Sequence, residues 1–303
     1  MKTIGLVNRF HVFDNWLKKS PHSINWYRKM VQPVTSSSTE TSVSPKPLLE
    51  FDRIGLEYPF EESVRTIIQE ISLTVEPGEF VTFVGPSGCG KTSILRMVSG
   101  LSPTKIGELR CHGQAVKKPL KNVGIAFQNP VLLPWRRTID NVLLPLEIVS
   151  PYKRDFKVNR DRYLEMAQKL LKAVGLKDFQ QQFPWQLSGG MRQRASLCRA
   201  LIHQPEILLL DEPFGALDAF TREEMWVMLQ TLWMEAKCVG MLITHDLREA
   251  VFLSDTVYVM SPRPSEIAFK LKIDLPRPRT LEMCLSDEFA HLAAELRRHI
   301  HKS

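Results

Sequence analysis

The sequence predicts an α/β protein whose core is a mostly parallel sheet with a phosphate-binding loop at one edge. Short apolar runs alternate with amphipathic helices through the middle of the chain, and this alternation is typical of parallel strands joined by helical crossovers. One run leads into a glycine-rich loop, and three others end in a polar residue of a kind that handles phosphate or metal. The carboxyl ends of parallel strands share one edge, where ligands bind, so we expect a single site there.

The predicted elements follow in chain order. The apolar runs typical of buried strands cover residues 80–84, 122–127, 207–210, 240–243 and 256–260. A helix is expected from Thr92 to about Val98, directly after the glycine-rich loop. Two further helices have apolar stripes at helical spacing. One runs through residues 164–174 and ends at Gly175, and the other runs through residues 191–202 and ends before Pro205.

The composition is that of an ordinary globular protein. The chain has 303 residues, of which 44% are hydrophobic and 24% charged, enough for one or two domains with a sizeable core. No apolar run approaches the roughly 18 residues of a membrane span, and the first residues lack the apolar segment of a signal peptide. The five cysteines are scattered, which is typical of reduced thiols in a cytosolic protein.

Charge and composition divide the chain into three zones. The net charge is +7, from 40 Lys and Arg against 33 Asp and Glu, and such an excess raises the question of a polyanionic partner. Most of it lies at the ends: residues 1–45 carry six basic and two acidic side chains, and residues 262–303 carry eight and six. We expect a flexible basic arm with a Ser/Thr/Pro-rich linker over 1–47, a domain over 48–262 and a short extension over 263–303.

The glycine-rich loop carries the first chemical signal. It fits the pattern G-x-x-x-x-G-K-[ST] with Gly85, Pro86, Ser87, Gly88, Cys89, Gly90, Lys91 and Thr92. The glycines permit positive φ and close backbone approach, so that successive N–H groups can surround phosphate oxygens at the start of a helix. Lys91 would reach the β- and γ-phosphates, and the Thr92 hydroxyl would ligate Mg²⁺. The motif predicts binding of ATP with Mg²⁺.

A second signal follows the strand at 207–210. Asp211 stands at its end and is followed by Glu212. Alone, such a pair is more often a strand that runs into a turn. Beside a phosphate-binding loop, Asp211 can hold Mg²⁺ through water, and Glu212 is a candidate general base for the attacking water.

A third motif points to a family. Leu187 is followed by Ser188, Gly189 and Gly190, and Ser188 lies 23 residues before Asp211. This stretch resembles the signature motif of ATP-binding cassette (ABC) ATPases. The resemblance covers about residues 48–262. It implies a P-loop NTPase fold, with a RecA-like parallel core, an antiparallel β subdomain and a helical subdomain inserted over about 129–187. It also implies that the signature binds the γ-phosphate of an ATP held by a second copy of the chain.

The resemblance assigns roles to four more residues. Gln128 matches the Q-loop glutamine, which senses Mg²⁺ or the attacking water, and His245 matches the switch histidine that contacts the γ-phosphate. Asp218 matches the D-loop aspartate, which communicates across the dimer. Tyr58 stands where the family places an aromatic ring that stacks on adenine; the alternative is an ordinary tyrosine on a surface strand.

Two positions depart from the family pattern. Met191 replaces the usual Gln after the signature glycines, and Gly215 replaces the usual Ser of the D-loop. Neither position is assigned to Mg²⁺ or to activation of water, so we expect hydrolysis to survive. The change at Gly215 puts one hydrogen bond across the dimer in doubt.

Two short segments resemble the nitrate/sulfonate/taurine importer ATPases: residues 132–136 (LLPWR) and residues 275–279 (LPRPR). The resemblance implies import of a small solute of that kind or a related organic anion. The partners would be two transmembrane permease subunits and an extracytoplasmic solute-binding protein, with this chain on the cytoplasmic face of the inner membrane. Trp135 docks the permease, packs the helical subdomain, or does both.

Two alternatives stay open at this stage. The first concerns function: a soluble ABC ATPase that acts on nucleic acid is the rival to an importer subunit, although no nucleic acid is expected for the latter. The second concerns the arm, whose apolar residues recur at helical spacing. It is either a basic amphipathic segment on the membrane or permease, a disordered tail, or the result of a start site placed too early, since Met30 precedes the linker.

Overall fold

The computed structural model describes residues 46–60 and 63–302. They belong to a compact unit that spans Pro45–Ser303. The hypotheses about the basic arm fall on residues 1–45 and therefore lie outside the described residues. Among the helices of the described part, none has the length and apolar character needed to cross a bilayer.

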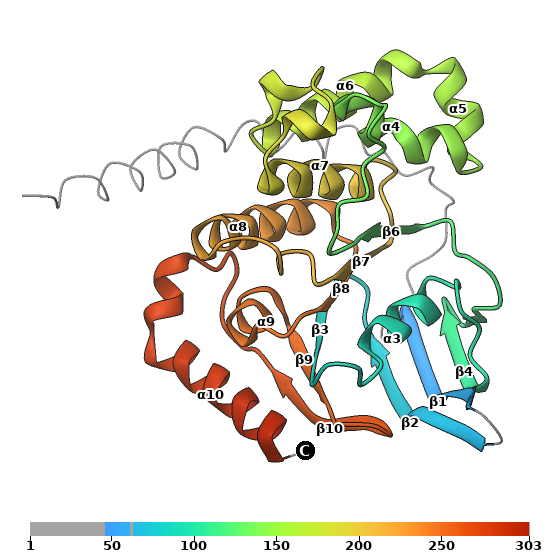
Figure 1. Ribbon diagram of the computed structural model, residues 1–303, viewed down its shortest axis with the longest axis vertical. Coiled ribbons are helices and arrows are strands. Elements are labelled where there is room, and N and C mark those ends of the chain that lie inside the picture. Colours follow the sequence, from blue (N-terminus) through green and yellow to red (C-terminus); the bar gives the residue numbers. More distant parts are fainter. Residues whose placement is uncertain (1–45, 61–62, 303) are drawn as a thin grey trace, which may run out of the picture. The chain divides into compact units, whose positions relative to one another are not determined.

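Within these residues the strands form one ten-stranded sheet in the order β5-β4-β1-β2-β10-β9-β3-β8-β7-β6 (Figure 1). The strands are β1 (Leu49–Phe60), β2 (Ser63–Val75), β3 (Phe80–Val84), β4 (Ile106–Cys111), β5 (Gln114–Ala115), β6 (Val123–Ala126), β7 (Ile207–Asp211), β8 (Val239–Ile243), β9 (Thr256–Met260) and β10 (Ser265–Lys272). The five predicted strands correspond to β3, β6, β7, β8 and β9.

The sheet has a parallel part and an antiparallel part. Strands β9, β3, β8, β7 and β6 are parallel neighbours, and every residue of β3, β8 and β9 is buried, which explains their continuous apolar runs. Strands β1, β2, β4 and β5 pair antiparallel. Strand β10 joins the two parts, because it pairs antiparallel with β9 and parallel with β2.

The helices of the described residues are α3 (Lys91–Val98), α4 (Thr138–Ile148), α5 (Tyr152–Val158), α6 (Arg160–Ala173), α7 (Gly189–Leu201), α8 (Ala219–Ala236), α9 (Leu247–Leu253) and α10 (Asp287–Lys302). Short 3-10 turns cover Lys177–Phe179, Pro184–Gln186 and Leu281–Leu285. The predicted end of α6 is confirmed: Gly175 has φ 74°, and the Leu176 amide donates to the Leu171 carbonyl at 2.7 Å. Both features belong to a glycine-terminated helix.

Helix α3 lies in the core between the parallel strands and β1 and β2 (Figure 1). Ile94 and Val98 of α3 pack in one buried cluster with Phe83 of β3 and Ile68 of β2. Helices α4, α5 and α6 form a separate helical group that packs on α7, and α7 lies against β6. This is the predicted P-loop NTPase arrangement, with an antiparallel β subdomain and an inserted helical subdomain.

The C-terminal residues are integrated into the fold. Strand β10 is part of the sheet, and α10 packs against α9, β9 and β10. The boundaries predicted at residues 47 and 262 stay predictions. The burial of Leu275 and Phe289 nevertheless indicates that the segment after residue 262 contributes to the core.

Candidate nucleotide-binding and hydrolysis site

The four predicted strand ends do meet at one edge of the sheet. Because β3, β8, β7 and β6 are consecutive parallel neighbours, the loop after β3, His245 after β8, Asp211 at the end of β7 and Gln128 after β6 all follow the same ends of their strands. Side-chain contacts divide these residues into two groups, one around Thr92 and Asp211 and the other around Glu212.

The loop after β3 has the backbone geometry that its sequence predicts. Gly88 has φ 80° and Gly90 has φ 106°, values that residues with a Cβ rarely adopt. A Cβ on Gly90 would also stand 3.0 Å from Cγ1 of Ile68. Helix α3 begins at Lys91 with no side-chain hydrogen bond at its N-cap, so the amides of its first turn can bind an anion.

Lys91 lies folded over the loop. Its Nζ donates to the carbonyl oxygens of Gly85 at 2.8 Å and Pro86 at 2.9 Å, and it lies 3.9 Å from the Cys89 Sγ. Burial raises the pKa of the Cys89 thiol despite this cation, so Cys89 stays a neutral packing residue. The carbonyls hold the ammonium group beside the site, where phosphate oxygens can replace them as acceptors.

Thr92 and Asp211 are brought together from different elements. The Thr92 Oγ1 donates to the Asp211 Oδ1 at 3.1 Å. Burial raises the pKa of Asp211, while the hydrogen bond from Thr92 and the cations Arg96 and Lys91 act in the opposite direction. A hydroxyl and a carboxylate at the foot of a phosphate-binding loop are hard oxygen donors of the kind that Mg²⁺ prefers. The donor set fits this ion.

Glu212 and His245 form the second group. The Glu212 Oε2 lies 3.2 Å from the His245 Nδ1. Glu212 has φ 45°, and its amide donates to the Ile243 carbonyl at 2.9 Å, which attaches the turn after β7 to the end of β8. Gln128 belongs here: a Cβ on Gly215 would lie 3.4 Å from its Nε2 and 3.7 Å from the Glu212 Oε2. The glycine leaves this space open between the two side chains.

Thr244, the residue before His245, contacts a buried carboxyl group. The Thr244 Oγ1 donates to the Glu249 Oε2 at 2.6 Å and accepts from the Asp246 amide at 3.0 Å. Glu249 is 3% exposed, and burial raises its pKa to about 8. Its Oε1 has no partner within the described part of the chain. Sequence reasoning missed Glu249, because a lone glutamate in a helix gives no local sign of burial.

The signature residues start helix α7. The Ser188 Oγ accepts from the Met191 amide at 3.3 Å, so Ser188 is the N-cap and Gly189 and Gly190 form the first turn. The Gln193 Nε2 donates to the Phe127 carbonyl at 3.2 Å, which ties α7 to the residue before Gln128.

Asp218 lies at the start of α8, close to the start of α7. Asp218 caps α8, accepting from the Thr221 amide at 3.1 Å and from the Thr221 hydroxyl at 2.7 Å. These bonds lower the pKa of Asp218. A Cβ on Gly190 would stand 3.0 Å from the Thr221 methyl carbon, so the starts of α7 and α8 are close neighbours. The predicted roles of Ser188, Gly189, Gly190 and Asp218 across a dimer stay predictions.

Tyr58 lies on β1 opposite Arg65 of β2. Its ring is 44% exposed, and the Lys105 Nζ lies 5.7 Å from the ring centroid. A half-exposed ring fits both interpretations of this residue, a platform for adenine and a surface tyrosine. Its role stays a prediction.

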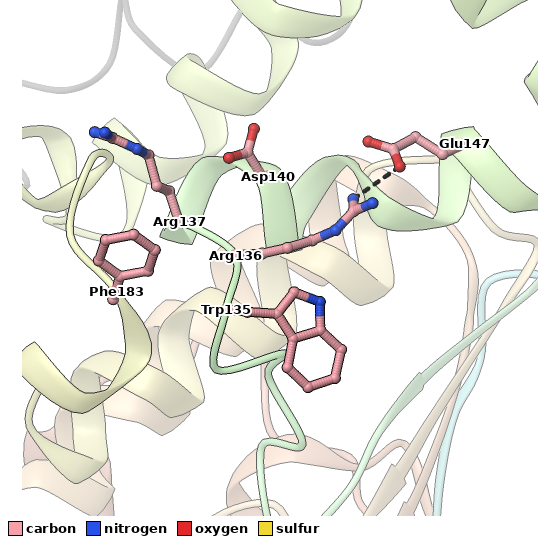
Figure 2. A pocket seen from close by; sticks show the side chains of 6 residues that line it. All are labelled: Trp135, Arg136, Arg137, Asp140, Glu147 and Phe183. Carbon is pink, nitrogen blue, oxygen red and sulfur yellow. Dashed lines mark hydrogen bonds and ion pairs between the residues drawn. The ribbon is translucent and has the colours of Figure 1, made fainter.

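A hollow lies in the helical group shortly after Gln128. Its volume is about 300 Å³, and Figure 2 shows its lining residues, Trp135, Arg136, Arg137, Asp140, Glu147 and Phe183. Trp135 is 71% exposed, which favours docking over packing as its main role, and docking itself stays a prediction. Arg136 is held by Glu147 at 2.7 Å, and Arg137 lies over the Phe183 ring.

Phe183 of this hollow and the neighbouring Trp185 were not predicted. Phe183 and Trp185 stack with their ring centroids 4.5 Å apart, and Trp185 is 64% exposed. The signal that could have found them is the sequence Phe-Pro-Trp two residues before the signature, where two large aromatic residues flank a proline. Exposed aromatic rings beside arginines are typical of protein contact surfaces.

The fold and the strand-end residues define an ATP-hydrolysing cassette. Comparison with known proteins gives the family: residues 68–215 match the family model described as ABC transporter. The taurine import ATP-binding protein TauB of Escherichia coli O157:H7 is 41% identical over 213 residues, 70% of this chain and 81% of that protein. TauB of E. coli O6:K15:H31 is 42% identical over 210 residues, 69% of this chain and 80% of that protein.

Solved structures agree. The post-hydrolysis dimer of the ATP-binding cassette MJ0796 with ADP and Pi superposes with a TM-score of 0.62 at 26% identity, covering 75% of this chain and all of that one. A second dimeric structure of MJ0796 gives a TM-score of 0.61 at 29% identity over the same shares. The chain belongs to the ATP-binding subunits of ABC transporters, in the nitrate/sulfonate/taurine importer subfamily. It is therefore an ATPase, and it binds nucleotide.

Proposed function

We propose that this chain drives a membrane permease that imports a small sulfonate, nitrate or related organic anion. The observation that carries the proposal is the hollow around Trp135, because it places an exposed aromatic and arginine surface a few residues after Gln128 of the hydrolysis site. The solute class is supported by the taurine-import relatives. The transported molecule itself would contact the permease and a solute-binding protein, not this chain.

The phosphate chain of ATP would lie on the amides of the loop between Gly85 and Gly90. Lys91 would exchange its bonds to the Gly85 and Pro86 carbonyls for bonds to phosphate oxygens, a stronger charge-assisted pairing. Thr92 and Asp211 would hold Mg²⁺, with Gln128 as a further oxygen ligand. Bound there, the ion would neutralise charge on the β- and γ-phosphates.

Glu212 would accept the proton of the attacking water. Its carboxylate is partly exposed and is oriented by His245 at 3.2 Å, so it can receive a proton at Oε1 while Oε2 keeps its partner. The His245 imidazole would contact the γ-phosphate of the bound ATP. A general base of this type contributes typically 10²–10⁴-fold to the rate.

A second copy of the chain would complete each site. Ser188, Gly189 and Gly190 lie at a helix start that can receive a phosphate, and we infer that they bind the ATP held by the partner copy. Asp218, adjacent to this helix start through Thr221, would connect the two sites. MJ0796, whose fold this chain shares, is described as a dimeric cassette.

The hollow would receive a cytoplasmic segment of the permease. Trp135 and Phe183 offer apolar surface to such a segment, while Arg137 and Asp140 offer hydrogen bonds at the rim. Because the same polypeptide segment continues from Gln128 to Trp135, closure of the cassette around ATP could move the docked permease. The chain would then act from the cytoplasmic face of the inner membrane.

The test is purification of the tagged chain from its native membranes. A multi-span membrane protein should co-purify, and Trp135→Ala should weaken that association at least about tenfold, as expected for a central aromatic contact. Leu285→Ala is the matched control, because Leu285 is 85% exposed but lies in a different part of the chain. Hydrolysis stimulated by DNA, with no membrane protein retained, would favour the nucleic-acid alternative instead.

A further inference from the structure

Residues 275–279, recognised in the sequence only as a subfamily motif, occupy a specific place in the fold. Arg279 is 2% exposed, and Arg277 is partly buried and lies over the Trp233 ring, with its guanidinium carbon 4.5 Å from the ring centroid. We call Arg277 and Arg279 the arginine pair. Both guanidinium groups donate to carbonyls at the C-terminal end of α9, the helix that begins directly after His245 and Asp246.

The arginine pair binds the carbonyls that the end of α9 leaves unpaired. The Arg279 Nη1 donates to Val251 at 2.7 Å, to Phe252 at 3.0 Å and to Ser254 at 2.7 Å. The Arg277 Nη2 donates to the Leu253 carbonyl at 2.5 Å. These carbonyls carry the negative end of the helix dipole, so two guanidinium groups satisfy both the hydrogen bonds and the charge.

The remaining contacts fix Arg279 from its own segment and from α8. Its Nη2 and Nε donate to the Leu275 carbonyl at 3.2 and 3.3 Å. Its amide donates to the Gln230 Oε1 at 2.8 Å, and its carbonyl accepts from the Gln230 Nε2 at 2.9 Å. Among the described residues no carboxylate touches the guanidinium directly, and burial lowers the pKa of Arg279 to about 10. Hydrogen bonds to the carbonyls therefore offset the cost of removing this cation from water.

Asp255 extends the same contacts to the strand that leads to the phosphate-binding loop. Its Oδ1 accepts from the Arg277 Nε at 2.9 Å, and its Oδ2 accepts from the Phe80 amide at 2.8 Å. The end of α9 is thus attached to the start of β3. At the other end of α9, Asp246 caps the helix and Arg222 holds that cap at 2.9 Å.

We propose that the arginine pair is a positioning device for His245: by fixing the C-terminal end of α9, it sets where the imidazole stands opposite Glu212. The helix has seven residues and is about 10 Å long, so a displacement at one end reaches the other almost undiminished. This inference rests on the role proposed for His245. In this proposal both arginines act only through α9 and make no contact with the nucleotide or with the attacking water.

Arg279→Lys in the full-length chain is the main test. Lysine keeps the charge but has three donors on one nitrogen instead of a planar fork, so it cannot bind Val251, Phe252 and Leu275 together. We expect kcat for ATP to fall roughly ten- to a hundredfold, as for misplaced catalytic groups, with KM unchanged within about twofold. In spectra of ¹³C-histidine-labelled protein, the His245 resonance, assigned by its loss in His245→Ala, should move while the other histidine signals stay.

Arg297→Lys is the matched control, because Arg297 is an exposed residue of α10, and it should change neither readout. If Arg279→Lys does not fold, Arg277→Lys is tested by the same two readouts. A folded variant with wild-type kcat, or with an unmoved His245 resonance, overturns the inference. The inference is also overturned if kcat falls, KM rises by the same factor and all histidine signals shift, because the substitution would then disturb the whole structure. Wild-type turnover in His245→Ala would contradict the role proposed for His245 but not the positioning of its side chain by the arginine pair. The His245 resonance in Arg279→Lys would still test that positioning.

Discussion

Glu212 and His245 face each other across the ends of two neighbouring strands, with Oε2 and Nδ1 3.2 Å apart. The contact depends on the backbone, because Glu212 adopts a positive φ that turns its side chain toward the end of β8. Within the part of the chain that the structure describes, the Oε2 of Glu212 is engaged and its Oε1 has no partner. The pair therefore combines a base with the group that orients it.

Replacing Glu212 by Gln should separate binding from turnover. The amide keeps the size of the side chain but cannot accept a proton from water, so phosphate release should fall by at least about 100-fold. ATP affinity, measured with a fluorescent nucleotide, should change little, because Lys91 and the loop amides remain. Glu165→Gln, on the exposed face of α6, is the control. Phosphate release from Glu212→Gln at the wild-type rate would contradict the role of Glu212 as base.

Thr92 should govern the dependence of ATP binding on Mg²⁺. Thr92→Val removes the hydroxyl that faces Asp211 and should weaken binding of ATP with Mg²⁺ by about tenfold, the loss expected for one bond to a charged group. Binding in EDTA should be unaffected. Thr92→Ser retains the hydroxyl and should behave as wild type. An equal loss with and without Mg²⁺ would show that Thr92 acts on the loop and not on the ion.

Gly90→Ala should impair both folding and nucleotide binding. The added methyl meets Ile68 at 3.0 Å in a backbone conformation with φ 106°, which costs roughly 1–3 kcal/mol. Gly78→Ala is an informative control, because Gly78 also has positive φ, 76°, but has nothing within 4 Å of the added atom. Urea unfolding should show the larger loss for Gly90→Ala, and only that variant should lose ATP affinity. Equal effects of both substitutions would refute the steric argument.

Glu249 should make the protein less stable as the pH rises. Burial raises the pKa of Glu249 to about 8 in the folded state, from 4.5 in the unfolded chain. The folded state therefore binds more protons between these values, and the stability that the neutral carboxyl permits is lost as the pH rises through 8. Between pH 6 and 8 this loss amounts to roughly 2 kcal/mol.

Glu249→Gln tests this dependence, because the amide oxygen can still accept from Thr244 but does not titrate. The free energy of unfolding, measured in urea at pH 6 and pH 8, should fall less for the variant than for the wild type. Asp211 also titrates abnormally, but it is present in both proteins and cancels in the difference. Parallel pH profiles would mean that the buried carboxyl is ionised throughout.

The residues that gather at the strand ends could be predicted from the sequence. The contacts that hold them in place could not. Gly85 to Thr92, Asp211 and His245 could be placed because their motifs are local and follow apolar strands of recognisable length. Phe183, Glu249 and Arg279 could not, since their roles come from residues distant in the chain. Arg279, for example, acts through Gln230 and Val251, 49 and 28 positions away, and an arginine after a proline gives no sign of burial.

Gln128 shows an intermediate case. Its place after β6 was predicted, yet its neighbour is Gly215 of the Glu212 turn, one of the two departures from the family pattern. The loss of a serine there was expected to affect a bond across the dimer. The structure adds a consequence within one chain, since the glycine leaves room between the Gln128 amide and the Glu212 carboxylate.

Strand β10 imposes an order on synthesis and folding. It pairs Ser265 with Ile68, nearly two hundred positions earlier in the chain, and it also pairs Leu271 with Val257. Until the ribosome has released these last strand residues, β2 and β9 present open edges. The nascent chain can form the phosphate-binding loop early, but the antiparallel and parallel parts of the sheet can join only after β10 has left the ribosome, which makes chaperone protection of those two edges most valuable before that point.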